Sequence, residues 1–276
     1  MMRVRTRCSL ALLGALACFV SACSGASETN PMNHSQSSSV GRPEWDAARS
    51  RTVFFAHQSV GENILDGLRH IASAEGYPAM SVVETGAALA TGPALWHEKV
   101  GQNGDPMSKI NGFTGALNAG AGARADIALM KFCFWDIQKD TDVKSVFSAY
   151  KDAMTHVSRQ FPNLTLVHTT VPLVVEDTDW KASVRRLLGM PVPTDLDNAA
   201  REELNKMIRQ EYGSRAGLFD IAALEQQTPA RAGVPYLAAA YSSDGAHLND
   251  AGRRVVAAGL VKSLAAVSSR VDAGTR

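Results

Sequence analysis

Near the C-terminus, an acid and an imidazole stand three residues apart, at Asp244 and His247. They lie in a turn that opens an amphipathic run, and at this spacing the two side chains can share a hydrogen bond. Such a bond fixes the tautomer of the imidazole and stabilises its charged form, as a general base requires. Chemistry then needs a nucleophile, a site for an oxyanion and a scaffold that positions them.

Ser59 is the candidate nucleophile. The apolar run 51–56 precedes it, and from Asn63 onward apolar residues recur at helical spacing, which predicts a strand, a tight turn and a helix. A serine in that turn exposes its hydroxyl, and the backbone N–H groups of the helix N-terminus can serve an oxyanion. The alternative is an N-capping serine whose hydroxyl accepts from the first turn of the helix. Position alone favours neither.

The rest of the chain alternates strands and helices. Strands are predicted at 51–56, 81–84, 125–134, 164–170 and 216–221, and helices after residue 63 and at 143–161, 197–212 and 251–267. The stretches 86–122 and 173–193 are predicted as long loops. Alternating elements favour a five-stranded parallel sheet with helices on both faces, an α/β fold. The candidate residues follow strands, at the edge where such sheets bind ligands.

Three segments resemble the SGNH (GDSL-type) hydrolases. They are Asp244-Gly-Ala-His247-Leu-Asn with the helix start Ala251-Gly252, Leu204-Asn205 on the preceding helix, and Leu218-Phe-Asp220. The resemblance extends over about residues 52–266. It implies a three-layer, flavodoxin-like α/β/α fold with a nucleophilic serine after the first strand. It also implies a catalytic triad of Ser59, Asp244 and His247.

The chain departs from this family around the nucleophile, where His57-Gln58-Ser59-Val60 replaces Gly-Asp-Ser-Leu. The family's oxyanion glycine follows the second strand, where this chain has Gly86. Its oxyanion asparagine follows the third strand, where this chain has Trp135 and then Asp136. The indole of Trp135 has one donor with a different reach, so the third oxyanion donor is unassigned. Asn63, His57 and Asp136 are further candidates for oxyanion or substrate contacts.

Other residues with reactive or ligating side chains have ordinary alternatives. Cys133 could be a nucleophile, but a buried structural cysteine is commoner where no charged partner stands beside it. His97, His156 and His168 are interpreted as structural or surface histidines. The polar loop from Trp96 to Lys109 could bind a sugar or only form its turns. Neither a metal-binding spacing nor a dinucleotide-binding glycine pattern stands out, so no metal and no cofactor are expected.

The N-terminus has the features of an export signal. Arg3, Arg5 and Arg7 precede a short apolar run, without an acidic residue. Val20-Ser-Ala-Cys23 resembles a bacterial lipobox, which implies cleavage before Cys23 and lipidation of its thiol. An ordinary secretory signal is the alternative. The expected location is therefore the cell envelope, as a lipoprotein that faces the periplasm or sits in the outer membrane.

This interpretation divides the chain into a signal peptide at 1–22, a flexible Ser-rich tether at 23–42 and one hydrolase-like domain at 43–276. Removal of the leader leaves 25 basic and 27 acidic residues. A surface so close to neutral argues against a nucleic-acid partner. Cys133 would be the one free thiol, so no intramolecular disulfide is expected. The domain is expected to be a monomer.

The sequence therefore predicts a serine esterase of the cell envelope. Ser59 attacks the ester carbonyl, His247 takes its proton, and Asp244 orients His247. The expected substrate is a small-molecule or polysaccharide ester, with an acyl or acetyl group on a carbohydrate or a lipid. Two alternatives stay open. One is a glycan-binding protein that keeps the fold without hydrolysis, and the other is an acyltransferase that uses the same triad.

Overall fold

The computed structural model describes residues 39–85, 92–214, 217–227, 230–231 and 233–274, with side chains as far as residue 267. All of these belong to one compact unit, Asn33–Arg276. The predicted signal peptide, Cys23, most of the tether and Gly86 lie outside the described residues. At the start of the described part, Val40 is buried, and its carbonyl oxygen accepts from the hydroxyl of Tyr77 at 2.9 Å.

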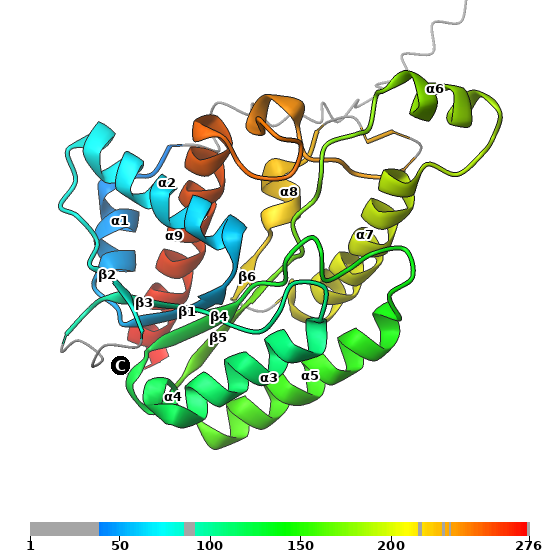
Figure 1. Cartoon of the computed structure of the whole chain (residues 1–276). Coiled ribbons are helices and arrows are strands. Elements are labelled where there is room, and N and C mark those ends of the chain that lie inside the picture. Colours follow the sequence, from blue (N-terminus) through cyan, green and yellow to red (C-terminus); the bar gives the residue numbers. More distant parts are fainter. Residues whose placement is uncertain (1–38, 86–91, 215–216, 228–229, 232, 275–276) are drawn as a thin grey trace, which may run out of the picture. The chain divides into compact units, whose positions relative to one another are not determined.

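Six parallel strands in the described residues form a sheet with the order β2-β3-β1-β4-β5-β6 (Figure 1). The strands are β1 (Val53–His57), β2 (Val82–Glu84), β3 (Leu95–Lys99), β4 (Ile127–Met130), β5 (Thr165–Thr169) and β6 (Leu218–Phe219). The predicted α/β class with a parallel sheet is confirmed, but the sheet has six strands rather than five. The additional strand is β3, in the stretch predicted as a loop.

β3 takes the place beside β1. The two strands pair in parallel with Phe55 opposite His97, and β2 pairs with the outer edge of β3. The other side of β1 pairs with β4. The chain thus places β2 and β3 on one side of β1, and β4, β5 and β6 on the other. In sheets of this class, ligands bind beyond the carboxyl ends of the two neighbouring strands from which the chain continues to opposite sides of the sheet. Here these strands are β1 and β4.

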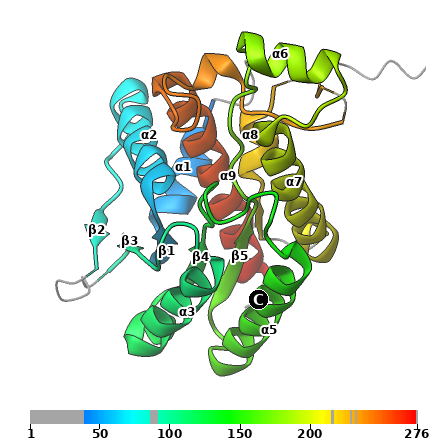
Figure 2. The same ribbon diagram turned by 45° about the vertical axis from the view of Figure 1, so that its right-hand side comes forward.

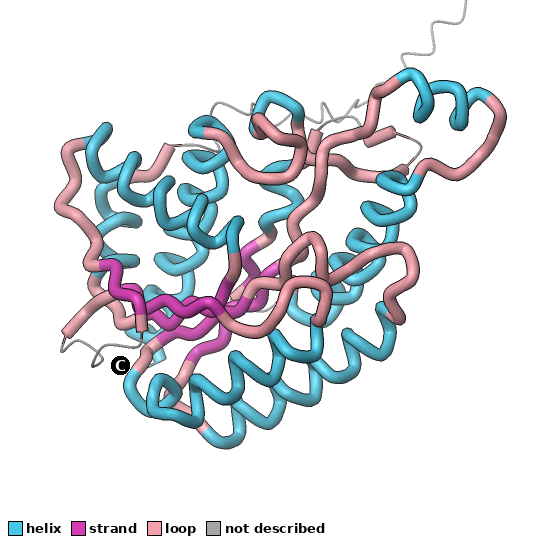
Figure 3. The backbone as a smooth tube through the Cα atoms, viewed as in Figure 1, coloured by secondary structure: helices cyan, strands magenta, loops and turns pink. Residues whose placement is uncertain are grey.

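Helices cover both faces of the sheet (Figures 1 and 2). One face carries α1 (Arg42–Arg49), α2 (Ser59–Glu75), α8 (Ile221–Glu225) and α9 (Asp250–Gly274); the other carries α3 (Pro106–Ala116), α5 (Val143–Gln160) and α7 (Pro193–Tyr212). Because side chains alternate along a strand, Val53 and Phe55 of β1 enter the first core, and Phe54 and Ala56 enter the second. Figure 3 shows the strands as the central layer between these helices.

α2 and α9 pack with their backbones close together. A Cβ atom at Gly67 of α2 would lie 2.3 Å from the carbonyl oxygen of Arg253 in α9, so only glycine allows this approach. α2 ends at Gly76, which adopts a left-handed φ of 63° and closes the last turn. The helix that begins at Ser59 is therefore held directly against the helix that follows His247.

The remaining connections contain short helical segments. These are η2 (Leu117–Ala121), α4 (Gly122–Arg124), α6 (Trp180–Leu187) and η3 (Ala239–Tyr241). α6 lies in the second stretch predicted as a loop, and its N-cap Asp179 accepts from the backbone N–H of Ala182 at 2.6 Å. The described helices include none with the length and apolar character needed to cross a membrane.

Candidate active site

The structure brings the three predicted triad residues together in the order that general-base catalysis requires. Nε2 of His247 lies 3.1 Å from Oγ of Ser59, and Nδ1 of His247 lies 2.7 Å from Oδ2 of Asp244. A carboxylate can only accept, so Nδ1 carries the hydrogen and Nε2 is left to accept from the serine hydroxyl. Ser59 and His247 are 188 positions apart in the sequence, and the sheet and the α2–α9 contact bring them together.

Local hydrogen bonds preform the acid–imidazole pair. Oδ1 of Asp244 accepts from the backbone N–H groups of Ala246 at 2.9 Å and His247 at 2.7 Å. Gly245, which directly follows Asp244, forms this turn with a left-handed φ of 89°. The N–H of His247, followed by that of Ala246, holds the pKa of Asp244 well below its usual range. Asp244 is therefore ionised at neutral pH and can stabilise a protonated His247.

Asn63 connects α2, the helix that begins at Ser59, to the turn that carries His247. Its Oδ1 accepts from the backbone N–H of Leu248 at 3.1 Å, and the residue is buried. The amide oxygen, at least, is therefore used in holding α2 against the residue that follows His247. If Asn63 donates to an oxyanion, as predicted from the sequence, the donor is its Nδ2.

Two adjacent aromatic residues follow β4, and the first of them packs on His247. The ring of Phe134 meets the ring of His247 edge-on, with centroids 5.6 Å apart and planes at 76°. Phe134 is buried, but its neighbour Trp135 is 54% exposed, with the two rings 5.9 Å apart. Trp135 therefore offers a large aromatic surface to solvent, next to the ring that packs on His247.

Asp136 connects the loop after β3 to the loop after β4 through hydrogen bonds. Its Oδ2 accepts from the backbone N–H of Cys133 at 2.6 Å, and its Oδ1 accepts from the N–H of Gly104 at 2.9 Å. The side chain is almost fully buried, and burial raises the pKa of this carboxyl, against the lowering effect of these backbone bonds. Because both oxygens are engaged, Asp136 is better placed to shape the loops after β3 and β4 than to contact a substrate.

The loop after β3 lies beside the turn that precedes Ser59. Nε2 of Gln58 donates to the carbonyl oxygens of Val100 and Gly101, each at 3.0 Å. Gly101 has a left-handed φ of 61°, and a Cβ there would lie 2.6 Å from the backbone nitrogen of Lys109. The sequence pattern did not indicate Gly101, because β3 lies in a stretch that was predicted as a loop. The strand Leu95–Lys99, whose last three residues are polar, leads directly into Val100-Gly101.

His57, a predicted substrate contact, is fully buried. Its Nδ1 bonds to the carbonyl oxygen of Gln58 at 2.8 Å, and its Nε2 lies 3.1 Å from Nδ1 of His97. Burial lowers the pKa of His57 to about 4, and burial also lowers the pKa of His97. Both rings are therefore neutral at pH 7, and both nitrogens of His57 are already engaged.

The other singled-out residues occupy structural or surface positions. Cys133 is buried with a free thiol, and its backbone N–H donates to Asp136. His168 is buried in β5, with Nδ1 at 2.9 Å from the hydroxyl of Tyr150. His156 lies exposed on α5. None of the three contacts the triad in the part of the chain that the structure describes.

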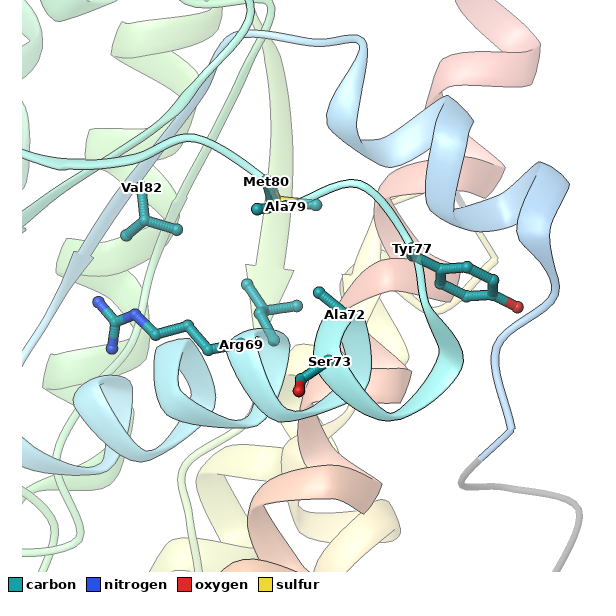
Figure 4. Close-up of a pocket in the computed structure, with 8 residues that line it drawn as sticks. Arg69, Ala72, Ser73, Tyr77, Ala79, Met80 and Val82 are labelled. Atoms are coloured by element: carbon teal, nitrogen blue, oxygen red, sulfur yellow. The ribbon is translucent and has the colours of Figure 1, made fainter.

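Two cavities have different characters. A depression of about 310 Å³ is open to solvent and lined by residues that include Asp244, His247, Asn249 and Arg253. A second, mainly apolar cavity of about 270 Å³ lies along the later turns of α2, and Figure 4 shows its lining, which includes Tyr77 and Met80. No triad residue lines the apolar cavity, whereas Asp244 and His247 line the open depression.

Comparisons with known proteins return solved structures at low identity and low TM-score. No model of a protein family matches the chain, and no curated protein sequence matches it. A solved structure provisionally described as a platelet activating factor from Streptococcus pneumonia matches with a TM-score of 0.47 and 15% identity, over 80% of this chain and 91% of the other. Another, a provisionally assigned GDSL-like lipase from Parabacteroides merdae, matches with a TM-score of 0.41 and 11% identity, over 78% and 96%.

These likenesses are low in both identity and TM-score. The class of the fold therefore rests on this chain's own strand order and helix layers: a three-layer α/β/α protein with a parallel sheet. The description of the site likewise depends on distances measured in this chain, in which the serine hydroxyl is hydrogen-bonded to the imidazole and the imidazole to the carboxylate.

Proposed function

We propose that this protein is a serine hydrolase that cleaves a carboxylic ester, with Ser59 as nucleophile, His247 as general base and Asp244 as the group that orients it. The observation that carries the proposal is the unbroken chain of two hydrogen bonds from the serine hydroxyl to the carboxylate, at 3.1 and 2.7 Å. An imidazole that an ionised acid holds in one tautomer, with its free nitrogen facing a serine hydroxyl, is the arrangement that activates a serine for nucleophilic attack.

The reaction follows from this geometry. Oγ of Ser59 attacks the ester carbonyl carbon while Nε2 of His247 takes the hydroxyl proton. The tetrahedral intermediate collapses, the C–O bond to the alcohol breaks, and His247 returns the proton to the leaving oxygen. A water molecule then attacks the acyl-enzyme by the same relay, which releases the acid and restores Ser59.

Backbone groups are the proposed oxyanion donors. The first N–H groups of a helix have no partner within the helix, and that of Ser59 begins α2. The second proposed donor is the N–H of Gly101, because the loop after β3 lies beside Gln58, the residue before Ser59. Gly101 replaces Gly86 in this role, since Gly86 follows the edge strand β2.

The exposed ring of Trp135 favours a carbohydrate ester as substrate. An aromatic face that is 54% exposed, one residue from the ring that packs on His247, can stack on the apolar face of a sugar. An acyl or acetyl group on that sugar would then reach Ser59. Lipidation of Cys23, which we also propose, would hold the enzyme at the cell envelope among polysaccharide and lipid esters.

The proposal predicts that a fluorophosphonate probe labels the full-length protein, and that Ser59→Ala abolishes the labelling. The probe reacts only with a serine whose hydroxyl is activated by a base, because the attacking oxygen must lose its proton. Labelling is measured by intact-protein mass spectrometry, as one phosphonyl adduct per chain.

The matched control is Ser148→Ala, since Ser148 is an exposed serine on α5. That variant should be labelled like the unaltered protein. An unaltered protein that takes up no probe would favour the glycan-binding alternative, and a Ser59→Ala variant that is still labelled would refute the nucleophile.

A second prediction concerns the substrate. Trp135→Ala should raise KM for an acetylated oligosaccharide about 2–10-fold, the usual value of an aromatic stacking contact, and should leave kcat nearly unchanged. KM for a small nitrophenyl ester should not change, because that ester has no sugar to stack. Steady-state kinetics with both substrates measure this difference.

Trp180→Ala supplies the comparison, since Trp180 is 72% exposed but lies on α6. Equal losses on both substrates after Trp135→Ala would show that Trp135 supports the site and does not recognise a sugar.

A further inference from the structure

Three side chains from separate elements meet next to the nucleophile's turn. His57 ends β1, Glu62 lies in the first turn of α2, and His97 lies on β3. One ligand atom from each lies within 4.8 Å of the others. We propose that these residues bind a divalent transition-metal ion of the zinc class, in a site separate from the triad.

The donor set suits such an ion. Imidazole nitrogens and a carboxylate are common zinc ligands, and a site with three protein ligands keeps its fourth position for water. The two facing nitrogens of His57 and His97 lie 3.1 Å apart. Two ligands about 2.0–2.1 Å from a tetrahedral ion are separated by about 3.3 Å. A small movement of one ring therefore accommodates the ion.

The contacts of His57 orient its ring as a ligand. Its Nδ1 faces the carbonyl oxygen of Gln58 at 2.8 Å. A carbonyl can only accept, so Nδ1 carries the hydrogen, and the lone pair of Nε2 points at His97. Metal-binding histidines usually donate their second N–H to a carbonyl or carboxylate in this way. His97 would bind through Nδ1 and carry its own proton on Nε2.

The exposure of Glu62 gives an ion access to the site, and its ion pair with Lys99 would compete with metal binding. Its side chain is 34% exposed, whereas both histidines are buried, so an ion would reach the site from the Glu62 side. The same carboxylate lies 3.2 Å from Nζ of Lys99. The metal ion and the Lys99 ammonium would therefore compete for one carboxylate.

The ion would cross-link the three segments that build the nucleophile's surroundings. His57 precedes Gln58 and Ser59, Glu62 follows them by one turn, and β3 leads to Gly101. The first turn of α2 approaches the His57 ring closely, since a Cβ at Gly61 would lie 2.2 Å from it. The ligands are not triad residues, so the ion's role is to hold this turn. The site does not depend on the proposed ester hydrolysis.

The spacing of these residues explains why sequence analysis expected no metal. The three ligands are 5 and 35 positions apart, which matches no short ligand motif. They meet only because β3 pairs beside β1, with Phe55 opposite His97.

The test uses the untagged full chain after dialysis against a chelator. Titration with Zn²⁺ against a chromophoric competitor should give one equivalent bound, and Co²⁺ should give the visible absorption of a four-coordinate site. At Zn²⁺ a hundredfold above Kd, the melting temperature should rise by about 5–10 °C. Glu62→Gln and His97→Gln should each weaken binding at least tenfold.

Two further variants make the test specific. Lys99→Met removes the competitor and should tighten binding severalfold, while His156→Gln, on the exposed face of α5, should change nothing. Melting curves of the metal-free variants show whether each folds. The proposal is overturned if the unaltered protein binds less than one equivalent, or if Glu62→Gln and His97→Gln bind like it. Weaker or equal binding by Lys99→Met would remove Glu62 from the ligand set.

Discussion

His247→Ala is expected to lower kcat/KM for a nitrophenyl ester by about 10⁴–10⁶-fold, with little change in melting temperature. The variant keeps Ser59 and its backbone N–H but removes the base 3.1 Å from the hydroxyl. Asp244→Asn should cost about 10⁴-fold. The carboxamide can still accept from the turn's N–H groups, but it no longer stabilises the charged imidazole. Steady-state kinetics and thermal unfolding measure both effects.

The double variant Ser59→Ala/His247→Ala provides a sharper test. Groups that act as one unit give losses that do not add, so the double variant should be no slower than either single one. His156→Ala controls for the loss of an imidazole elsewhere. A His247→Ala enzyme that keeps more than a tenth of the activity would exclude His247 as the base.

Asn205→Ala should lower the free energy of unfolding by about 2–5 kcal/mol, since it leaves a buried backbone donor and a buried acceptor without partners. Asn205 lies fully buried on α7. Its Oδ1 accepts from the N–H of Val171 at 2.6 Å, and its Nδ2 donates to the carbonyl of the same residue at 3.0 Å. Urea unfolding followed by circular dichroism measures the change.

The effect should extend to the active site. Beyond Val171, the N–H of Val175 donates to the carbonyl of Gly245 at 2.8 Å, within the turn that carries the catalytic pair. Asn198, two helical turns before Asn205, holds Val174 through both of its amide atoms. Lys206→Ala, at the exposed neighbouring position, is the control. A loss below 1 kcal/mol for Asn205→Ala would contradict this account of α7.

The site residues that local pattern could reveal were predicted from the sequence. Asp244 and His247 interact across three positions, and their turn is made by their own backbone. Ser59 was indicated by an apolar run followed at once by a helical repeat. These inferences needed only short stretches of chain, because the physical interactions behind them are themselves short-ranged.

What depends on strand order could not be predicted in the same way. Leu95–Lys99 is short and ends in three polar residues, so its pattern is that of a loop, and it becomes a strand by pairing between β1 and β2. Because β3 was not predicted, Gly86, after the second predicted strand, was the one glycine considered for the oxyanion site, and Gly101, which we propose, was not. The same omission hid the meeting of His57 with His97. The loop bridge made by Asp136 was missed for the same reason.

The long stretch of sequence between Ser59 and His247 also affects when the site can form during synthesis. A ribosome completes β1 and the start of α2 early, but it adds Asp244 and His247 only shortly before α9, the last helix of the described chain. Until then no imidazole lies beside the hydroxyl of Ser59, and α2 lacks the helix against which Gly67 packs. A product truncated before Asp244 would carry Ser59 without the acid–imidazole pair, so the proposed hydrolytic activity would appear only after His247 had been added.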